Sequence, residues 1–156
     1  MILIALIAIL TGAYGVLAVV APQMDDKRRG RISVALLFVF TGLGHFVNPE
    51  PMAAMLPPWV PARVPMIYAT GLLEWAGAVG LLVPRYARAA GLCLLTFLVA
   101  VFPANVFAAL NHVEMGGHEL GPAYLLVRAP FQLALMWWTY HFAVRVPAIQ
   151  DEPARV

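Results

Sequence analysis

The chain has few charged residues and almost no cysteine. Charged residues make up 12% of its 156 residues and hydrophobic residues 62%, whereas a soluble domain carries about 25% charged residues. This shortage of charge excludes an ordinary soluble domain. The mean hydropathy of +0.82 indicates instead a small integral membrane protein of one domain. The single cysteine, Cys93, excludes an intrachain disulfide and dithiol chemistry carried out by the chain alone.

The sequence also lacks the short motifs of common catalytic and cofactor sites. It contains no glycine-rich phosphate loop, no H-E-x-x-H zinc motif, no G-x-S-x-G nucleophile elbow and no C-x-x-C-H haem motif. His112 and His118 lack the tight spacing of a metal site, so we predict no metal. A net charge of +2 gives no reason to expect nucleic acid. The expected partner is the lipid bilayer, and the motifs leave open whether the protein is an enzyme.

Long apolar runs take the place of the missing charges. A helix needs roughly 17–25 residues to cross a bilayer, and five runs of about this length occupy residues 1–22, 32–48, 64–84, 87–111 and 121–144. The sequence therefore predicts an all-α, polytopic membrane helical bundle. The first run has no basic segment before it, and Pro22 follows its only small-residue cleavage site. We therefore interpret this run as a retained helix and not as a signal peptide.

The distribution of Lys and Arg predicts the orientation of the helices. Successive loops alternate between the two sides of a membrane, and one side receives residues 23–31, residues 85–88 and the tail, 145–156. That side holds eight of the ten basic residues, whereas the loops of the other side hold only Arg63. Because Lys and Arg are enriched in cytoplasmic loops, we expect the N-terminus outside and the tail in the cytoplasm.

Two charged residues interrupt the apolar runs, Glu74 in the third and Arg128 in the fifth. A charge in hydrocarbon costs roughly 2.5–3.5 kcal/mol on insertion scales, so such a residue usually faces the bundle interior and has a partner there. We therefore predict a buried ion pair between Glu74 and Arg128. At about 1.5 Å per helical residue, His45 and Asn105 fall with this pair in the outer half of the bilayer.

Helical spacing adds two polar residues to this set, because Tyr124 and Gln132 lie four residues before and after Arg128 on one helix face. Together these side chains predict a polar, ligand-binding pocket in the outer half of the bilayer. A second interpretation stays open, since a buried Glu–Arg pair with polar partners can simply fix the helix register. The candidate ligand-binding residues are His45, Glu74, Asn105, Tyr124, Arg128 and Gln132.

The two loops expected on the outer side differ in character. Residues 48–65 contain six prolines in eighteen residues, which excludes a regular helix throughout and allows only a short turn at residues 53–56. Trp59 is expected at the level of the lipid head groups. Residues 112–120 contain Gly116-Gly117 and are expected to form a flexible, solvated loop.

Five segments resemble the DoxX-like family of small bacterial membrane proteins. They read GLGHF (42–46), LPPWVP (56–61), TGLLEWAGAVGLLVP (70–84), AVFPANVFAALN (100–111) and RAPFQLALMWW (128–138). The resemblance covers about residues 32–142. It implies a four-helix transmembrane domain at residues 32–144 in the bacterial inner membrane, with residues 1–22 as an extra N-terminal transmembrane helix.

The resemblance also implies a class of function. The family takes its name from subunits of a thiosulfate:quinone oxidoreductase, and some members are linked to membrane complexes that handle thiol or oxidative stress. It therefore implies an accessory or ligand-holding subunit of a quinone-linked redox system, with a quinone as candidate cofactor and a membrane oxidoreductase complex as partner. Two alternatives stay open: a structural or assembly protein, and a small proton-linked transporter in which Glu74 and His45 carry protons.

Overall fold

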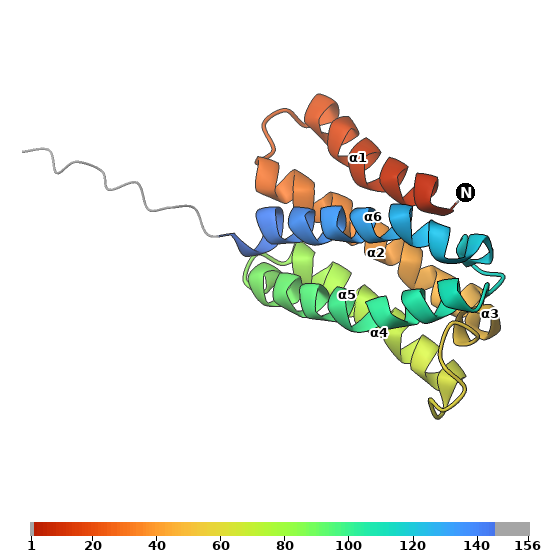
Figure 1. Ribbon diagram of the computed structural model, residues 1–156. Helices are drawn as coiled ribbons and strands as arrows, with labels where there is room; N and C mark the ends of the chain where they lie inside the picture. The colour runs from red at the N-terminus through yellow and green to blue at the C-terminus, as the bar shows by residue number, and fades with distance from the viewer. Residues whose placement is uncertain (1, 146–156) are drawn as a thin grey trace, which may run out of the picture.

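The helices of the computed structural model follow the five apolar runs (Figure 1). The structure describes residues 2–145. Within them, four helices are long and apolar enough to cross a membrane, namely α1, α2, α4 and α5. The prediction of an all-helical, multi-pass architecture is confirmed at this level. The elements are α1 (Ile2–Val20), α2 (Asp26–Val47), α3 (Pro49–Ala53), α4 (Arg63–Leu82), α5 (Ala87–Leu110), η1 (His118–Tyr124), α6 (Leu125–Thr139) and η2 (Tyr140–Val144).

Helix α2 begins at Asp26, six residues before the apolar run that predicted it. The Asp25 side chain caps this helix by accepting a hydrogen bond of 3.3 Å from the backbone N–H of Arg28. Asp26 follows in the first turn, where a negative charge interacts favourably with the helix dipole. The charged segment after α1 is therefore helical, although its composition predicted a loop.

The fifth run is divided, in contrast to the single helix predicted over residues 121–144. Its first part is the 3-10 helix η1, in which Gly121 has a φ of 70° and breaks the helical path before Pro122. Regular α-helix extends only over the 15 residues of α6, and the five-residue π-helix η2 continues it. Because α6 is shorter than a typical span, a fifth crossing would need α6 and η2 together.

Helix α2 lies at the centre of the bundle and contacts α1, α4 and the α6–η2 segment. Helix α4 packs on α2 and α5, and α6 packs on α5 and α2. The most completely buried large side chains are Val34, Leu37 and Phe38 of α2 and Leu81 of α4. Tyr14 of α1 packs edge-on against Trp138 of α6 at 5.5 Å. The polar side chains of α2, α4, α5 and α6 are therefore placed within one helical bundle.

Helices α2 and α4 cross closely through two glycines. A Cβ atom on Gly71 would lie 2.8 Å from the Cβ of His45 and 3.2 Å from the carbonyl oxygen of Gly42. The indole N–H of Trp75 donates a hydrogen bond of 3.1 Å across the crossing to the carbonyl of Val39. This close approach brings the polar side chains of the two helices within hydrogen-bonding reach.

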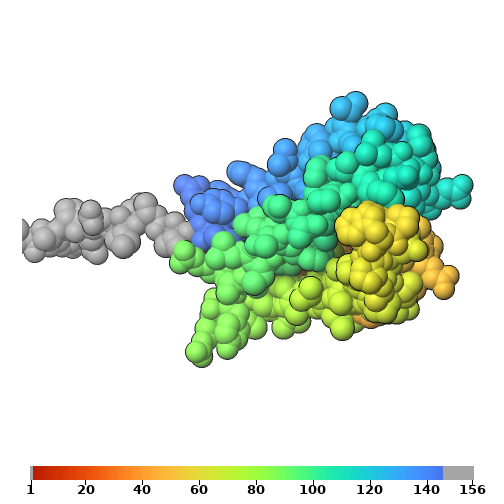
Figure 2. All heavy atoms as spheres, turned by 60° about the horizontal axis from the view of Figure 1, so that its bottom comes forward, coloured from red at the N-terminus to blue at the C-terminus, as the bar shows by residue number. Residues whose placement is uncertain are grey.

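The connections between the helices lie at two opposite ends of the bundle. One end carries the α1–α2 and α4–α5 connections and the end of η2, and the other carries α3 and η1 (Figure 1). Lys27 donates a hydrogen bond of 3.0 Å to the carbonyl of Arg145 and so joins two parts of the first end. Figure 2 shows the proline-rich segment, in yellow, at the same end as the segment after α5, in teal. The predicted alternation of loops is thus present in the described part of the fold.

Candidate functional site

The predicted polar residues form two clusters on different helix pairs. The first, here the α2–α4 cluster, consists of Thr41 and His45 from α2 with Thr70 and Glu74 from α4. Glu74 is only 7% exposed, and the hydroxyl of Thr41 donates a hydrogen bond of 2.6 Å to its Oε2. His45 Nε2 lies 3.5 Å from its Oε1. Both oxygens of this carboxylate therefore face a polar neighbour on α2.

Thr70 connects the His45 ring to the backbone of α4. The Thr70 hydroxyl lies 2.7 Å from the carbonyl oxygen of Ile67 and 3.1 Å from His45 Nδ1. Two forms of the neutral ring satisfy these contacts. Thr70 either donates to Nδ1, which leaves the ring proton on Nε2, or accepts from Nδ1–H, which leaves Nε2 bare towards Glu74. The His45–Glu74 contact is favourable only when one proton lies on either Nε2 or the carboxylate.

The second cluster, here the α5–α6 cluster, contains Asn105 of α5 and Arg128 and Gln132 of α6. Arg128 donates through Nε to Oδ1 of Asn105 at 3.2 Å, and Asn105 donates through Nδ2 to the carbonyl of Val101 at 3.0 Å. The Gln132 amide donates to the carbonyl of Leu98. The Arg128 guanidinium also lies over the ring of Phe131, 5.9 Å from its centre. Helix α5 therefore holds the Arg128 side chain in place.

In and beside the α5–α6 cluster, three buried polar atoms have no hydrogen-bond partner among residues 2–145. They are Nη1 of Arg128, Oε1 of Gln132 and Nε2 of His118. His118 and Gln132 are each 3% exposed. Nδ1 of His118 donates to the carbonyl of Met115 at 2.6 Å, which leaves Nε2 as an acceptor in the neutral ring. The α5–α6 cluster and His118 of η1 thus present one cationic donor and two acceptors. An unmet buried polar group costs about 1–3 kcal/mol, so such atoms indicate a place for a polar partner.

Burial lowers the pKa of His118 below its ordinary value of 6.5, and the nearby charge of Arg128 adds to this effect. Tyr124, 8% exposed, packs edge-on against the His118 ring at 4.8 Å. The backbone carbonyl of Met115 and the carboxylate of Glu119 oppose the shift. The net result favours a neutral imidazole at this end of the bundle.

The predicted ion pair between Glu74 and Arg128 is wrong, because no such salt bridge forms within the described residues. The two residues lie on α4 and α6, which both pack on α2 and α5, and each residue finds its partner on a different one of these two helices. The crossing at Gly71 places α4 against α2, so that Thr41 and His45 of α2 contact the Glu74 carboxylate. Arg128 lies on α6 beside α5, where Asn105 accepts its hydrogen bond.

His118 is the residue whose importance the sequence did not reveal, since its loop was expected to be solvated. Gly116 and Gly117 adopt φ values of 67° and 108°, a left-handed conformation that favours glycine. These two residues turn the chain back so that His118 is buried beside Tyr124. The Gly-Gly pair directly before a histidine was the available signal, because it permits a tight turn.

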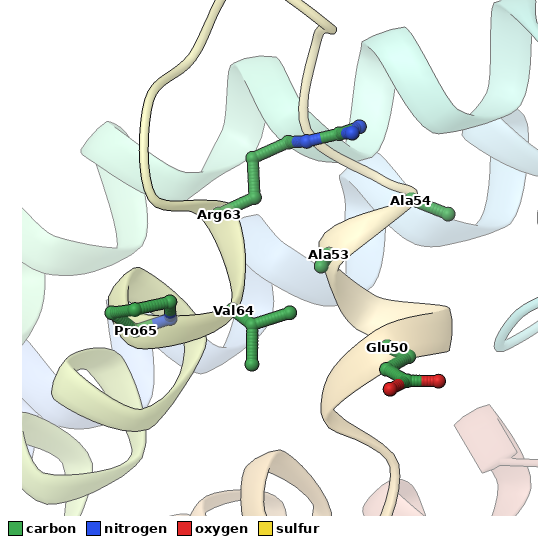
Figure 3. Close-up of a pocket in the computed structure, with 6 residues that line it drawn as sticks. All are labelled: Glu50, Ala53, Ala54, Arg63, Val64 and Pro65. Carbon is green, nitrogen blue, oxygen red and sulfur yellow. The ribbon is translucent and has the colours of Figure 1, made fainter.

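A cavity of about 480 Å³ lies away from both clusters, beside α3 and the start of α4 (Figure 3). None of the six predicted residues lines it. The lining residues are Glu50, Ala53, Ala54, Arg63, Val64 and Pro65. This cavity is therefore formed by the proline-rich segment and the start of α4, apart from the predicted ligand-binding residues.

Residues 34–143 match a family model described as "Domain of unknown function (DUF8561)". The chain belongs to this family. The matched region includes both polar clusters and leaves α1 outside it. No curated protein and no solved structure matches the chain.

Proposed function

We propose that this protein is a ligand-holding accessory subunit of the bacterial inner membrane, and that its site is the α5–α6 cluster with His118. The observation that carries this proposal is the buried Nη1 of Arg128, which has no partner among the described residues. Asn105 fixes the guanidinium through Nε, so this free N–H group is held in a defined direction. A charged donor that is buried and held without a partner is well suited to bind the polar end of a ligand.

The chemistry of the three unpartnered atoms favours a quinone-type head group. Arg128 offers a charged donor to a carbonyl oxygen, and Gln132 and the neutral His118 offer acceptors to a hydroxyl group. Quinones carry carbonyl oxygens, and their reduced forms carry hydroxyl groups. The residues present therefore fit either form, and the apolar surroundings suit a lipid-soluble molecule.

The accessory role rests on the resemblance to DoxX-like proteins and on the single cysteine. A chain with only Cys93 has no second thiol for disulfide chemistry. We therefore assign the redox step to a partner oxidoreductase and the holding of the ligand to this chain. In the proposed arrangement, residues 32–144 are the four-helix core, α1 is the additional helix, and the end with α3 and η1 faces outward.

The proposal is tested by extracting the purified protein with organic solvent and identifying bound molecules by mass spectrometry. Binding of a short-chain quinone is then measured by equilibrium dialysis. Because a hydrogen bond to a charged group contributes about 1.5–3 kcal/mol, Arg128→Gln is expected to weaken quinone binding about ten- to a hundredfold. Arg88→Gln is the matched control, since Arg88 is exposed near the other end of the bundle. Equal quinone binding by the Arg128→Gln variant and the wild type would reject the proposal.

The shared proton of the α2–α4 cluster favours a second candidate function, proton-linked transport. His45 and Glu74 lie 3.5 Å apart and need one proton between them. In vesicles with an internal pH-sensitive dye, the transporter hypothesis predicts a proton flux that Glu74→Gln abolishes. Glu114→Gln, on an exposed loop residue, should leave this flux unchanged. A wild-type protein without proton flux would remove this candidate.

A further inference from the structure

The cavity beside α3 has walls of opposite charge. Arg63, at the start of α4, extends along one side and Glu50 of α3 lies on the other, with Ala53 and Ala54 between them (Figure 3). Its volume of about 480 Å³ falls within the range of about 300–1,000 Å³ that is usual for ligand sites.

The two charges do not neutralise each other. Among residues 2–145, neither Glu50 nor Arg63 takes part in a salt bridge. Arg63 donates through Nη1 to the carbonyl of Leu56 at 3.4 Å, which orients its side chain along the loop. A positive and a negative group thus lie on one cavity, separated from each other. This arrangement is complementary to a ligand that carries both charges.

The surroundings of the cavity place it at the membrane surface. It lies in the connection between the ends of two membrane-length helices, α2 and α4. Trp59 in the same connection is 82% exposed, as is typical of tryptophans in the head-group region. The rest of the lining is apolar, with Ala53, Val64 and Pro65. A ligand of this cavity therefore has access to the lipid surface.

We propose that this cavity binds the head group of a zwitterionic phospholipid, with the phosphate against Arg63 and the ammonium group against Glu50. An anionic phospholipid would satisfy Arg63 but would be repelled by Glu50. A small water-soluble zwitterion would match the charges but leave the apolar lining without contact. The lipid satisfies both requirements, because its glycerol and upper acyl carbons continue from the head group into the bilayer.

Native mass spectrometry of the delipidated, full-length protein in detergent tests this proposal. The probes are short-chain phosphatidylethanolamine, short-chain phosphatidylglycerol and soluble glycerophosphoethanolamine. The wild type is expected to retain one phosphatidylethanolamine about fivefold more tightly than phosphatidylglycerol, because a single charge near the membrane surface contributes about this factor. Glycerophosphoethanolamine should not displace it at equal concentration. Equal retention of the two lipids, or displacement by the soluble compound, would overturn the assignment.

Two variants separate the roles of the two charges. Arg63→Gln should weaken the binding of both lipids about fivefold, because both carry a phosphate. Glu50→Gln should weaken phosphatidylethanolamine and strengthen phosphatidylglycerol, so that the preference disappears. Arg85→Gln is the matched control, since Arg85 follows the opposite end of α4, and should leave both affinities unchanged. Circular dichroism confirms that each variant keeps its helices. A folded Glu50→Gln variant that keeps the wild-type lipid preference, or a folded Arg63→Gln variant that binds both lipids as tightly as the wild type, would overturn the proposal.

Discussion

Glu74 is held in an apolar helix by one threonine hydroxyl and one imidazole, and not by the arginine that the sequence suggested. The Thr41 hydroxyl lies 2.6 Å from its Oε2. The same oxygen of Thr41 lies farther, at 3.2 and 3.4 Å, from the carbonyls of Leu37 and Phe38. Because a hydroxyl has one proton, the shortest contact indicates that Thr41 donates to Glu74.

Replacing Thr41 by Val keeps the shape of the side chain and removes this donor. We expect Thr41→Val to lower the free energy of unfolding by about 1–3 kcal/mol, the cost of a buried polar group left without its partner. Thr41→Ser keeps the hydroxyl and should lie much closer to the wild type. Unfolding in mixed detergent, followed by circular dichroism, measures both variants. Equal losses in the two would show that the methyl group matters and the hydrogen bond does not.

His118 predicts a dependence of stability on pH. Burial lowers its pKa in the folded state below 6.5, so below pH 6.5 the unfolded chain binds more protons at this residue than the folded one. The contribution of His118 to the free energy of unfolding is therefore fully present above pH 6.5. It is lost as the pH falls toward the folded-state pKa. His118→Asn keeps a donor for the Met115 carbonyl without titrating. It should show a smaller loss of melting temperature between pH 7.5 and 5, and an unchanged pH profile would contradict this account.

At the scale of elements, the helical faces could be predicted more securely than the ends of the helices. The spacing of residues along α4 predicts one packed face of seven residues: Ile67, Thr70, Gly71, Glu74, Gly77, Ala78 and Leu81. Five of them are buried, and Thr70 and Gly77 are half-buried. Period alone did not predict the start of α2, because a capping aspartate extends a helix into charged sequence. It also did not predict the break at Gly121, which depends on a left-handed backbone conformation.

The candidate site shows the same division between what spacing reveals and what it does not. The sequence predicted that Asn105 and Arg128 lie at a similar depth, because depth follows from the position of a residue along its helix. In the structure a hydrogen bond joins the two side chains. The partner of Glu74 depended on which helices are neighbours, and a sequence without repeats carries little information about that. The closeness of α2 and α4 follows from Gly42 and Gly71, whose complementarity becomes visible only when the two helices are in contact.

The close crossing of α2 and α4 predicts that a Gly→Ala substitution lowers stability at the crossing but not elsewhere. An added methyl group at Gly71 would lie 2.8 Å from the Cβ of His45 and force the helices apart, at about 1–3 kcal/mol. Gly12→Ala is the matched control, since a Cβ there meets nothing within 4 Å and alanine favours the helix. Thermal unfolding in detergent should show a large loss for Gly71→Ala and no loss for Gly12→Ala. A loss of equal size in both would contradict the close crossing.

At the scale of the whole molecule, the asymmetry of charge between the two ends predicts the direction of insertion. One end of the bundle carries the α1–α2 connection, the α4–α5 connection and Arg145 (Figure 1). The basic residues of these segments therefore lie together at that end. Because such residues stay in the cytoplasm, we expect the end with α3 and η1 to face outward. The tail assigned to residues 145–156 lies outside the described residues apart from Arg145.

Labelling of single cysteines from the two sides measures this orientation. The natural Cys93 is exposed and is first replaced by alanine. Cysteines at Arg28 and Glu114, both exposed, should then react with an impermeant maleimide from opposite sides of the membrane, with Glu114→Cys labelled in intact cells. Gly117 is unsuitable for this purpose, because a side chain there would collide with the Tyr124 ring. Labelling of both positions from one side would exclude the proposed arrangement.

The hydrogen bond between Arg128 and Asn105 also bears on how the chain is synthesised. Helix α5 precedes α6, so Asn105 leaves the ribosome before Arg128 does. A charge entering hydrocarbon alone costs roughly 2.5–3.5 kcal/mol on insertion scales, and an amide already in the membrane offsets part of that cost. The last hydrophobic segment would thus depend on its predecessor for efficient insertion, and a ribosome stalled between them would expose a helix pair that is only half assembled.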